Sequence, residues 1–318
     1  MSSRHVLITG GAGFIGTHLS TALLARGDTI TAVDNLSAGI LPALSTLTTR
    51  PNFTLIQHDV TVPLDVTVPV DVVVHLASVI GTDIMAKQPV GTLKTGSLGA
   101  LNALEFAKQH GARIVLASSS EIYGDPLVYP QREEYRGNAD PTALLSCYAE
   151  AKRFTEAAAF AYHRQHGLSI GIVRPFNVYG PGTDLTDRRV VSAFITQALA
   201  GQALTLNYGG LQTRSFCYVS DFVDGLIALI DSGQQGPINL GASEEITIRA
   251  LADLIVEIVG SGRVITAPGR IQDDGFARRC PDLTRAHELL GWQPQVGLRE
   301  GIELTAAWMR AMWDEARA

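Results

Sequence analysis

A glycine-rich turn near the N-terminus constrains the fold of this chain more than any other feature. The segment His5–Thr9 is short, apolar and β-branched, and Phe14–Arg26 has the periodicity of an amphipathic helix. Between them, Gly10, Gly13 and Gly16 stand at the spacing GxxGxxG. A strand that enters a helix through such a turn is typical of a sheet of parallel strands with helices on its faces.

The three glycines also indicate what binds at this turn. Gly10 permits the tight turn, Gly13 lets backbone N–H groups approach a pyrophosphate at the positive end of the helix, and Gly16 allows the helix to pack closely on the strand. The next predicted strand, Thr29–Val33, is followed by Asp34, roughly 20 residues beyond the turn, where a carboxylate accepts hydrogen bonds from an adenosine ribose. Together these features predict a dinucleotide site.

The residues around Asp34 favour NAD over NADP as the dinucleotide. The carboxylate repels a 2′-phosphate, and neither Asn35 nor Leu36 is an arginine that could hold one. The other positions predicted to contact the cofactor lie at the start of the first helix or just after a strand: Phe14, Ile15, Asn35, Asp59, Val60, Leu76, Ala77 and Ser78.

The alternation of strand and helix continues up to Arg174 and then stops. Further strands are predicted at Phe53–Gln57, Val70–His75, Arg113–Ala117 and Ser169–Val173, and helices at Gly91–His110, Cys147–His166, Val190–Ala200, Val219–Asp231, Ile248–Val259 and Arg299–Trp313. The pattern predicts an α/β chain with a Rossmann-type doubly wound parallel sheet in residues 1–175, to which segments around 215–240 return. Residues 176–318 are expected to form mainly a smaller C-terminal α/β substrate-binding domain.

Composition narrows the classes of function. The net charge is −6 and no dense Lys/Arg block occurs, which argues against a nucleic-acid partner. No apolar run approaches the roughly 20 residues that span a bilayer, and the N-terminus lacks the features of a signal peptide, so we expect a cytoplasmic protein without membrane insertion. Cys147, Cys217 and Cys280 show no CxxC spacing, and His75 ends an apolar strand. We therefore expect packed thiols, a strand-end histidine and no metal site.

Tyr148 and Lys152 form a candidate catalytic pair. They lie four residues apart at the start of a predicted helix, so their side chains share one face. A nearby ammonium favours phenolate and lowers a pKa that is about 10 in water. The tyrosine could then take a proton from a substrate hydroxyl while hydride leaves for NAD.

Motifs along the whole chain carry a resemblance to a known family. They are TGGAGFIGTHL from Thr9, VVHLAS from Val73, SSSEIYGDP from Ser118, YAEAK from Tyr148, RPFNVYGP from Arg174, LQTRSFCYVSD from Leu211 and PDLTRAHELLGW from Pro281. The chain resembles the extended short-chain dehydrogenase/reductase family of NAD-dependent epimerases and dehydratases. Within it, the runs SEIYGDPLVYPQ, CYAEAKR, RRVVSAF and QTRSFCYVSD look most like the UDP-glucuronate decarboxylases, also called UDP-xylose synthases.

The resemblance implies a reaction and a role for particular residues. Tyr148 would deprotonate the sugar C4 hydroxyl, NAD would take the C4 hydride, and the 4-keto acid would lose carbon dioxide to give UDP-4-keto-xylose, UDP-xylose or both. Ser119 matches the hydroxyl that binds the C4 oxygen, and Glu121 matches a carboxylate near C5. Arg279 matches an arginine near the substrate carboxylate, where a guanidinium suits a carboxylate and equally a phosphate.

Three further positions match the part of the family site that binds the nucleotide. Asn177 matches a contact to the diphosphate, and Arg189 and Arg214 match residues that line the UDP site. The helices Gly91–His110 and Cys147–His166 resemble those that the family pairs across a four-helix dimer interface, so a homodimer is expected.

Other functions stay open at this stage. A sugar 4,6-dehydratase carries Asp before the Glu, whereas this chain has Ser120, and a 4-epimerase usually lacks a carboxylate at the position of Glu121. A non-catalytic NAD-sensing or scaffold protein on the same fold is the alternative of another class. Ser119, Tyr148 and Lys152 argue against it.

The chain also departs from the decarboxylase pattern in three places. Residues 79–85 replace a proline-rich stretch, Gly96 replaces an Asn that helps to order the catalytic helices, and residues 207–210 read NYGG where the family has YGDG. These changes raise the hypothesis of a variant that releases the 4-keto pentose together with NADH.

Overall fold

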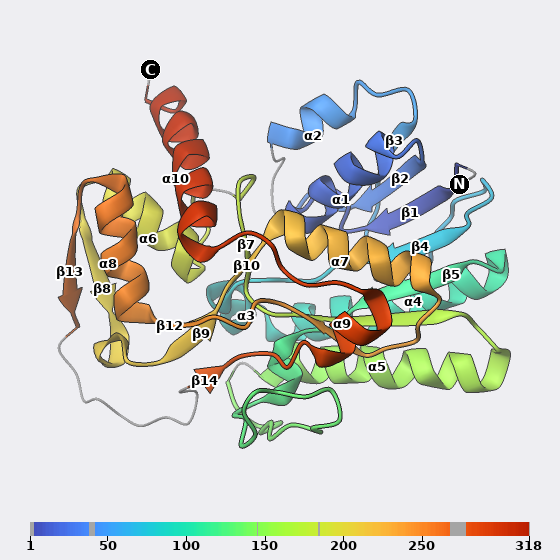
Figure 1. Ribbon diagram of the computed structural model, residues 1–318. Helices are drawn as coiled ribbons and strands as arrows, with labels where there is room; N and C mark the ends of the chain where they lie inside the picture. The colour runs from blue at the N-terminus through green and yellow to red at the C-terminus, as the bar shows by residue number, and fades with distance from the viewer. Residues whose placement is uncertain (1–2, 38–41, 145, 184, 268–277, 318) are drawn as a thin grey trace.

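The computed structural model describes residues 3–37, 42–144, 146–183, 185–267 and 278–317. Its centre is a parallel sheet of seven strands in the order β11-β6-β5-β4-β1-β2-β3 (Figure 1). The strands are β1 (His5–Thr9), β2 (Thr29–Asp34), β3 (Phe53–Gln57), β4 (Val72–His75), β5 (Arg113–Ala117), β6 (Ile170–Pro175) and β11 (Ile238–Leu240). This confirms the predicted doubly wound α/β class.

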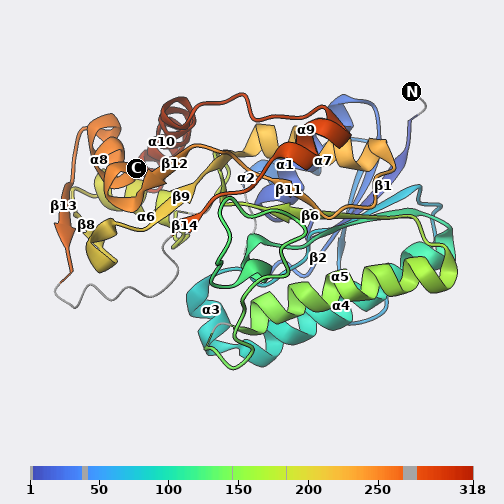
Figure 2. The same cartoon turned by 60° about the horizontal axis from the view of Figure 1, so that its bottom comes forward.

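Helices cover both faces of this sheet and bury its apolar strands. On one face α1 (Phe14–Ala25) and α7 (Val219–Ser232) pack with residues such as Leu19 and Leu226. On the other face α4 (Pro89–His110) and α5 (Ser146–His166) lie side by side and bury Leu104 and Ala158 (Figures 1 and 2). Burial on both faces explains why the strands read as nearly continuous Val, Ile and Leu.

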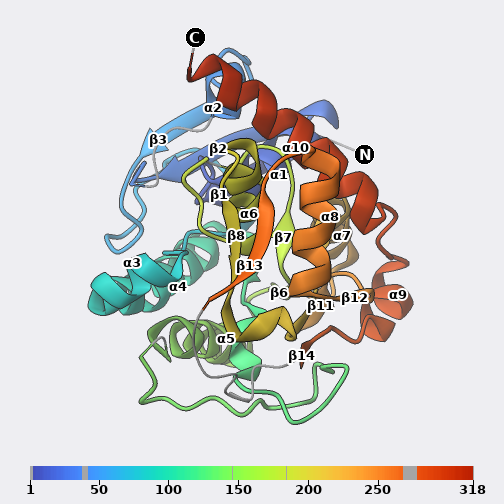
Figure 3. The same ribbon diagram turned by 90° about the vertical axis from the view of Figure 1, so that its left-hand side faces the viewer.

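A smaller region packs beside the carboxyl edge of the sheet (Figure 3). Its core lies among α6 (Val190–Leu199), α8 (Ile248–Val259) and α10 (Leu298–Glu315). The described residues also form three small sheets in or beside this region: β8 (Ala203–Leu206) with β13 (Arg263–Thr266), β9 (Thr213–Ser215) between β12 (Glu245–Thr247) and β14 (Arg278–Arg279), and β7 (Val178–Tyr179) with β10 (Cys217–Tyr218).

The bounds of the predicted helices and strands agree with the structure within about three residues, whereas the short elements were not predicted. Strand β4 begins at Val72 and not at Val70, because Asp71 uses its backbone N–H and its carboxylate to bond the backbone of His5. The helices α2 (Pro42–Leu47), α3 (Thr82–Lys87) and α9 (Thr284–Leu290) had no prediction. Helices of six or seven residues carry little periodicity, so the sequence alone does not indicate them.

Segments from the range 215–240 return to the large sheet, where α7 covers one face and β11 pairs with β6. The domain boundary at residue 175 stays a prediction. Within the described residues, no helix is both long and apolar enough to cross a membrane.

Candidate active site

Two glycines of the glycine-rich turn have no room for a side chain, and a third is less crowded. A Cβ on Gly10, whose φ is +72°, would lie 2.7 Å from the Ala77 nitrogen, and a Cβ on Gly16 would lie 2.3 Å from the Gly10 oxygen. Gly13 is less crowded, because its Cβ would meet only that oxygen, at 3.3 Å. Gly13 is also the N-cap of α1, and no side chain caps this end. The backbone N–H groups of the first turn therefore fit a pyrophosphate.

Asp34 is fixed beside this turn by backbone hydrogen bonds. One carboxylate oxygen accepts from the Ala12 N–H at 3.1 Å and the other accepts from the Leu36 N–H at 2.9 Å. Asn35 instead closes a local turn, with its side-chain oxygen accepting from the Ser37 N–H at 3.1 Å. The carboxylate thus lies at the end of β2, where the hydroxyl groups of a ribose could donate to its remaining acceptor sites.

The other predicted cofactor positions follow β3 and β4. Asp59 accepts from the Thr61 N–H at 2.8 Å, and the carbonyl of buried Val60 accepts from Asn102 at 2.8 Å. After β4, Leu76 and Ala77 lie against Gly10, and Ser78 forms a hydrogen bond with Tyr148. This last contact links the cofactor loop to the predicted catalytic pair.

Lys152 is buried between α5 and the end of β5. Its ammonium donates to the Ala117 carbonyl at 2.8 Å and lies 5.7 Å from the centre of the Tyr148 ring. Burial lowers the pKa of Lys152 to about 8. The lysine is therefore held close to the tyrosine by its helix and by one carbonyl.

The hydroxyl of Tyr148 meets Ser119 as well as Ser78. Burial raises the pKa of Tyr148, the hydrogen bond from Ser119 opposes this shift, and the charge of Glu121 adds to it. The pKa of Tyr148 is therefore raised, whereas the nearby ammonium was expected to lower it, so that prediction was wrong in direction. The physical reason is that desolvation of the phenolate is the largest influence on the group.

Ser119 and Glu121 stand at the end of β5, around the short 3₁₀ helix η1 (Ser120–Tyr123). The Ser119 hydroxyl caps this helix by accepting from the Glu121 N–H at 3.1 Å. The Glu121 carboxylate pairs with Arg279, which also donates to the Gly124 carbonyl at 3.3 Å. Arg279 in β14 lies opposite Arg214 in β9, and burial, with the charge of Arg279 next, lowers the pKa of Arg214 to about 10.

Arg189 and Asn177 both follow β6, and each is held by a polar contact. The Arg189 guanidinium pairs with Asp187 at 2.6 Å and lies 5.5 Å from the centre of the Phe14 ring, at the start of α1. Asn177 adopts a left-handed backbone with φ of 39° and donates to the Ser215 carbonyl at 2.8 Å. The structure thus brings Arg189 to the cofactor turn itself, which the sequence did not indicate.

His75 and Arg174 are buried polar residues near this site that received no catalytic role from the sequence. His75 lies 2.8 Å from the Thr9 hydroxyl, and burial, with the charge of Lys152 next, lowers its pKa to about 3. It is a neutral strand-end histidine, as predicted. Arg174 binds Glu156, Tyr123 and the carbonyl of Glu133. The sequence signals for Arg174 were its position after a predicted strand and its place at the start of the motif RPFNVYGP.

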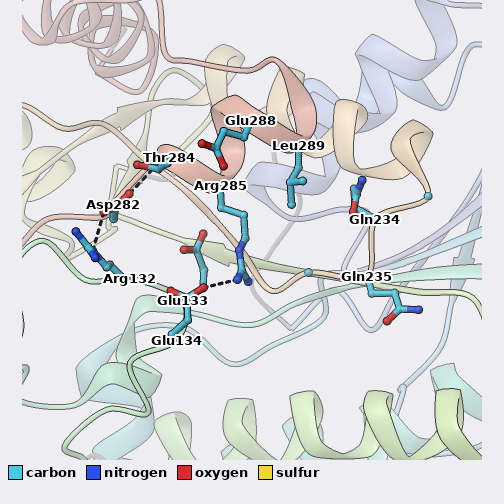
Figure 4. Close-up of a pocket in the computed structure, with 12 residues that line it drawn as sticks. Arg132, Glu133, Glu134, Gln234, Gln235, Asp282, Thr284, Arg285, Glu288 and Leu289 are labelled. Atoms are coloured by element: carbon cyan, nitrogen blue, oxygen red, sulfur yellow. Dashed lines mark hydrogen bonds and ion pairs between the residues drawn. The ribbon is translucent and has the colours of Figure 1, made fainter.

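A separate cavity of about 780 Å³ lies between the loop around residue 133 and α9 (Figure 4). Its charged side chains form the ion pairs Arg132–Asp282, at 3.2 Å, and Arg285–Glu134. None of the predicted site residues lines it. Elsewhere, all three cysteines are buried thiols, and the described residues include no cluster of three or more His, Cys, Asp or Glu suited to a metal ion.

A turn shaped for pyrophosphate between the first strand and the first helix of a doubly wound sheet defines a dinucleotide-binding fold, and here a Ser–Tyr–Lys cluster lies beside that turn. The chain belongs to the NAD dependent epimerase/dehydratase family, whose sequence model matches residues 6–241. NAD is accordingly its cofactor, as the sequence predicted, and supplies a hydride acceptor when bound.

Comparison with individual proteins gives the same family. The chain is 47% identical over 304 residues to UDP-glucuronic acid decarboxylase 5 of Arabidopsis thaliana, covering 95% of this chain and 88% of that protein. It is 46% identical over 307 residues to UDP-glucuronic acid decarboxylase 1 of Xenopus tropicalis, covering 96% and 72%.

Solved structures with the same fold are more distant in sequence. UDP-glucose 4-epimerase of Thermotoga maritima, with UDP-glucose, has a TM-score of 0.86 at 28% identity and covers 97% of this chain and 99% of that one. The dTDP-glucose 4,6-dehydratase DesIV of Streptomyces venezuelae, with NAD, has a TM-score of 0.85 at 27% identity and covers 96% and 97%.

Proposed function

We propose that this chain is an NAD-dependent UDP-glucuronate decarboxylase. The observation that carries the proposal is the pairing of Glu121 with Arg279 next to Ser119 and Tyr148. It places a carboxylate and a guanidinium beside the group that would start the oxidation. Relatives named UDP-glucuronic acid decarboxylase, at 43% to 48% identity over most of this chain, support the same activity.

The proposed chemistry begins with Tyr148. Tyr148 would take the proton of the C4 hydroxyl while Ser119 holds that oxygen, and NAD, held at the glycine turn, would supply the hydride acceptor for C4. The C4 ketone would then be β to the C6 carboxylate. When the C5–C6 bond breaks, its electron pair would move to the C4 oxygen as an enolate, carbon dioxide would leave, and protonation at C5 would give UDP-4-keto-xylose. Return of a hydride to C4, with the proton on Tyr148 going to the C4 oxygen, would give UDP-xylose.

The remaining site residues divide between the sugar and the nucleotide. Arg279 orients the sugar carboxylate, and Glu121 fixes Arg279 and faces C5. Asn177, Arg189 and Arg214 hold the diphosphate and the uridine side of the substrate. Lys152, kept charged below its pKa of about 8, supports the phenolate of Tyr148.

The alternative activities fit these residues less well. A 4,6-dehydratase needs an acid that expels the C6 hydroxyl, and the position before Glu121 is the buried Ser120. A 4-epimerase has no use for the Glu121–Arg279 pair, because it only rotates the keto sugar and returns the hydride. A scaffold or sensor would not need the bond between Tyr148 and Ser119.

We further propose a cytoplasmic homodimer joined through α4 and α5. Their exposed apolar residues include Val90, Leu93 and Leu98 on α4 and Phe154 on α5, which a second copy could cover. Light scattering of the protein and of a Leu93→Glu, Phe154→Glu variant tests this. A variant with unchanged mass would exclude this surface.

The activity is tested by mass spectrometry after incubation with UDP-glucuronate, UDP-glucose and dTDP-glucose, each with NAD. Loss of carbon dioxide from UDP-glucuronate supports the proposal. Loss of water or an unchanged mass with a new epimer refutes it. Absorbance of NADH distinguishes the products: a stoichiometric rise indicates release of the 4-keto pentose, and no rise indicates UDP-xylose. Tyr148→Phe is the inactive control and should still bind NAD.

A further inference from the structure

A buried arginine outside the reacting groups joins the segments that carry them. Arg174 is the next-to-last residue of β6, and its side chain is only 7% exposed. Its Nε and Nη2 donate to the two oxygens of Glu156 at 2.9 and 2.8 Å. Its Nη1 donates to the Tyr123 hydroxyl at 2.8 Å and to the Glu133 carbonyl at 2.9 Å. Four hydrogen bonds from one fork-shaped group fix its position closely.

The Glu156 end of this network reaches the first catalytic segment. Glu156 lies on α5 one turn beyond Lys152 and two turns beyond Tyr148, on the same face. One of its oxygens also accepts from the Ser118 hydroxyl at 2.6 Å. Ser118 precedes Ser119 directly. The carboxylate thus ties the helix that carries the proposed base to the strand end that carries its partner hydroxyl.

The Tyr123 end reaches the other side of the same segment. Tyr123 is the last residue of η1, two residues after Glu121, and it is buried. Its hydroxyl donates to Asn239 in β11 at 2.8 Å, and its ring lies 5.0 Å from the Arg174 guanidinium. Residues 119–121 are therefore anchored on both sides to one guanidinium.

We propose that Arg174 and Glu156 are positioning residues that hold Ser119 and Glu121 in register with Tyr148. The inference rests on the proposed roles of Ser119, Glu121 and Tyr148. The pair acts on these three residues through Ser118, which donates to Glu156, and through Tyr123, which accepts from Arg174. Lysine at position 174 could not replace it, because an ammonium lacks the planar fork that binds both oxygens of Glu156.

Loss of the Arg174–Glu156 pair should change turnover and its pH dependence, which a loss of stability alone would not do. A displacement of about 1 Å between reacting groups costs roughly 100-fold in turnover. Binding of NAD at the glycine turn should be unchanged. The groups that face the Tyr148 hydroxyl are Ser119 and Glu121 at η1, Ser78 after β4, Lys152 on α5 and Arg189 before α6. Because the Ser119 bond lowers the pKa of Tyr148, its loss should move the acid limb of the kcat profile to higher pH.

The experiment compares Arg174→Lys, Glu156→Gln and the double variant Arg174→Met, Glu156→Leu with the parent protein. Removal of one partner leaves a buried charge without its counterion, which lowers the stability of the fold. Replacement of both partners by apolar residues avoids this loss of stability. We expect kcat to fall about 100-fold in all three, with NAD affinity unchanged. We expect the thermal midpoint to fall in the single variants and to recover in the double variant while kcat stays low.

The matched control is Arg113→Met. Arg113 is a partly buried arginine on the same sheet that donates to the carbonyls of Ile170 and Gln234, away from the catalytic segments. This substitution should lower the thermal midpoint of unfolding and leave kcat nearly unchanged. The inference is overturned if kcat recovers with stability in the double variant, if kcat is normal in the folded variants, or if Arg113→Met loses turnover equally. Failure of the proposed function is separate: the parent protein itself would then release no carbon dioxide from UDP-glucuronate.

Discussion

Replacement of Gly96 by alanine is a sharp test of how the two long helices position the site. Gly96 in α4 faces Ala151 in α5, and a Cβ added at Gly96 would lie 2.6 Å from the Cβ of Ala151. Ordinary contacts between carbons are roughly 3.5 to 4.0 Å, so the helices would have to separate by about 1 Å. Thr155 resists this movement, because its hydroxyl donates to the Gly96 carbonyl at 3.1 Å.

The expected magnitude follows from two opposing effects. Overpacking costs about 1–3 kcal/mol, and alanine regains about 1 kcal/mol of helix propensity relative to glycine. Gly96→Ala should therefore lower the free energy of unfolding by about 0–2 kcal/mol. Since Ala151 lies between Tyr148 and Lys152 in the sequence, movement of α5 should also reduce kcat by roughly 10- to 100-fold.

A double-mutant cycle isolates the steric part of the effect. Ala151→Gly removes the opposing Cβ, so Gly96→Ala, Ala151→Gly only moves the glycine from one helix to the other. We expect the two changes to be coupled by about 1–3 kcal/mol in urea unfolding and kcat to recover in the double variant. A coupling energy near zero, or a normal kcat in Gly96→Ala, would refute this account of the helix contact.

Three further changes probe buried charge and the cofactor site. Because the pKa of His75 is about 3 when folded and 6.5 in the unfolded chain, only the unfolded chain gains a proton between these values, so stability falls with acidity. From pH 7 to 5 the parent should lose about 2 kcal/mol more than His75→Gln in urea unfolding, with exposed His166→Gln as control. The pKa of Lys152 is about 8 when folded and 10.5 in the unfolded chain, so only the folded chain loses its proton between these values. The free energy of unfolding should therefore rise from pH 8 to 10.5 in the parent and not in Lys152→Met. An equal pH dependence in the two proteins would contradict the burial of Lys152. Asp34→Ala should weaken NAD binding about 10- to 100-fold in fluorescence titration, since charge-assisted hydrogen bonds contribute about 1.5–3 kcal/mol; unchanged affinity would remove Asp34 from the site.

The sequence predicted the parts of the molecule that local chemistry determines. Runs such as His5–Thr9 are apolar because both faces of the strand are covered, and the spacing of Gly10, Gly13 and Gly16 follows from close contacts within a few residues. Tyr148 and Lys152 share a helix face for the same kind of reason. Each of these features can be identified within a short window of sequence.

The parts that depend on distant contacts could not be predicted in this way. The raised pKa of Tyr148 comes from burial, which several separate segments create. The partners of Arg174 come from η1, α5 and the loop around Glu133, far apart in the chain. Arg189 meets Phe14 only because the smaller region packs against the start of α1.

The arrangement of charges gives a final test that separates a sugar acid from a neutral sugar. Arg214 and Arg279 lie opposite each other on neighbouring strands, and Glu121 pairs with Arg279. With a pKa of about 10, Arg214 is charged at neutral pH, so this wall of the site carries two guanidinium groups next to the Glu121 carboxylate. It should favour UDP-glucuronate over UDP-glucose by about 10- to 100-fold in affinity, and Arg279→Gln should remove most of that difference while UDP affinity changes little. Equal affinity of the parent for the two sugars would show that this wall does not face the sugar carboxylate.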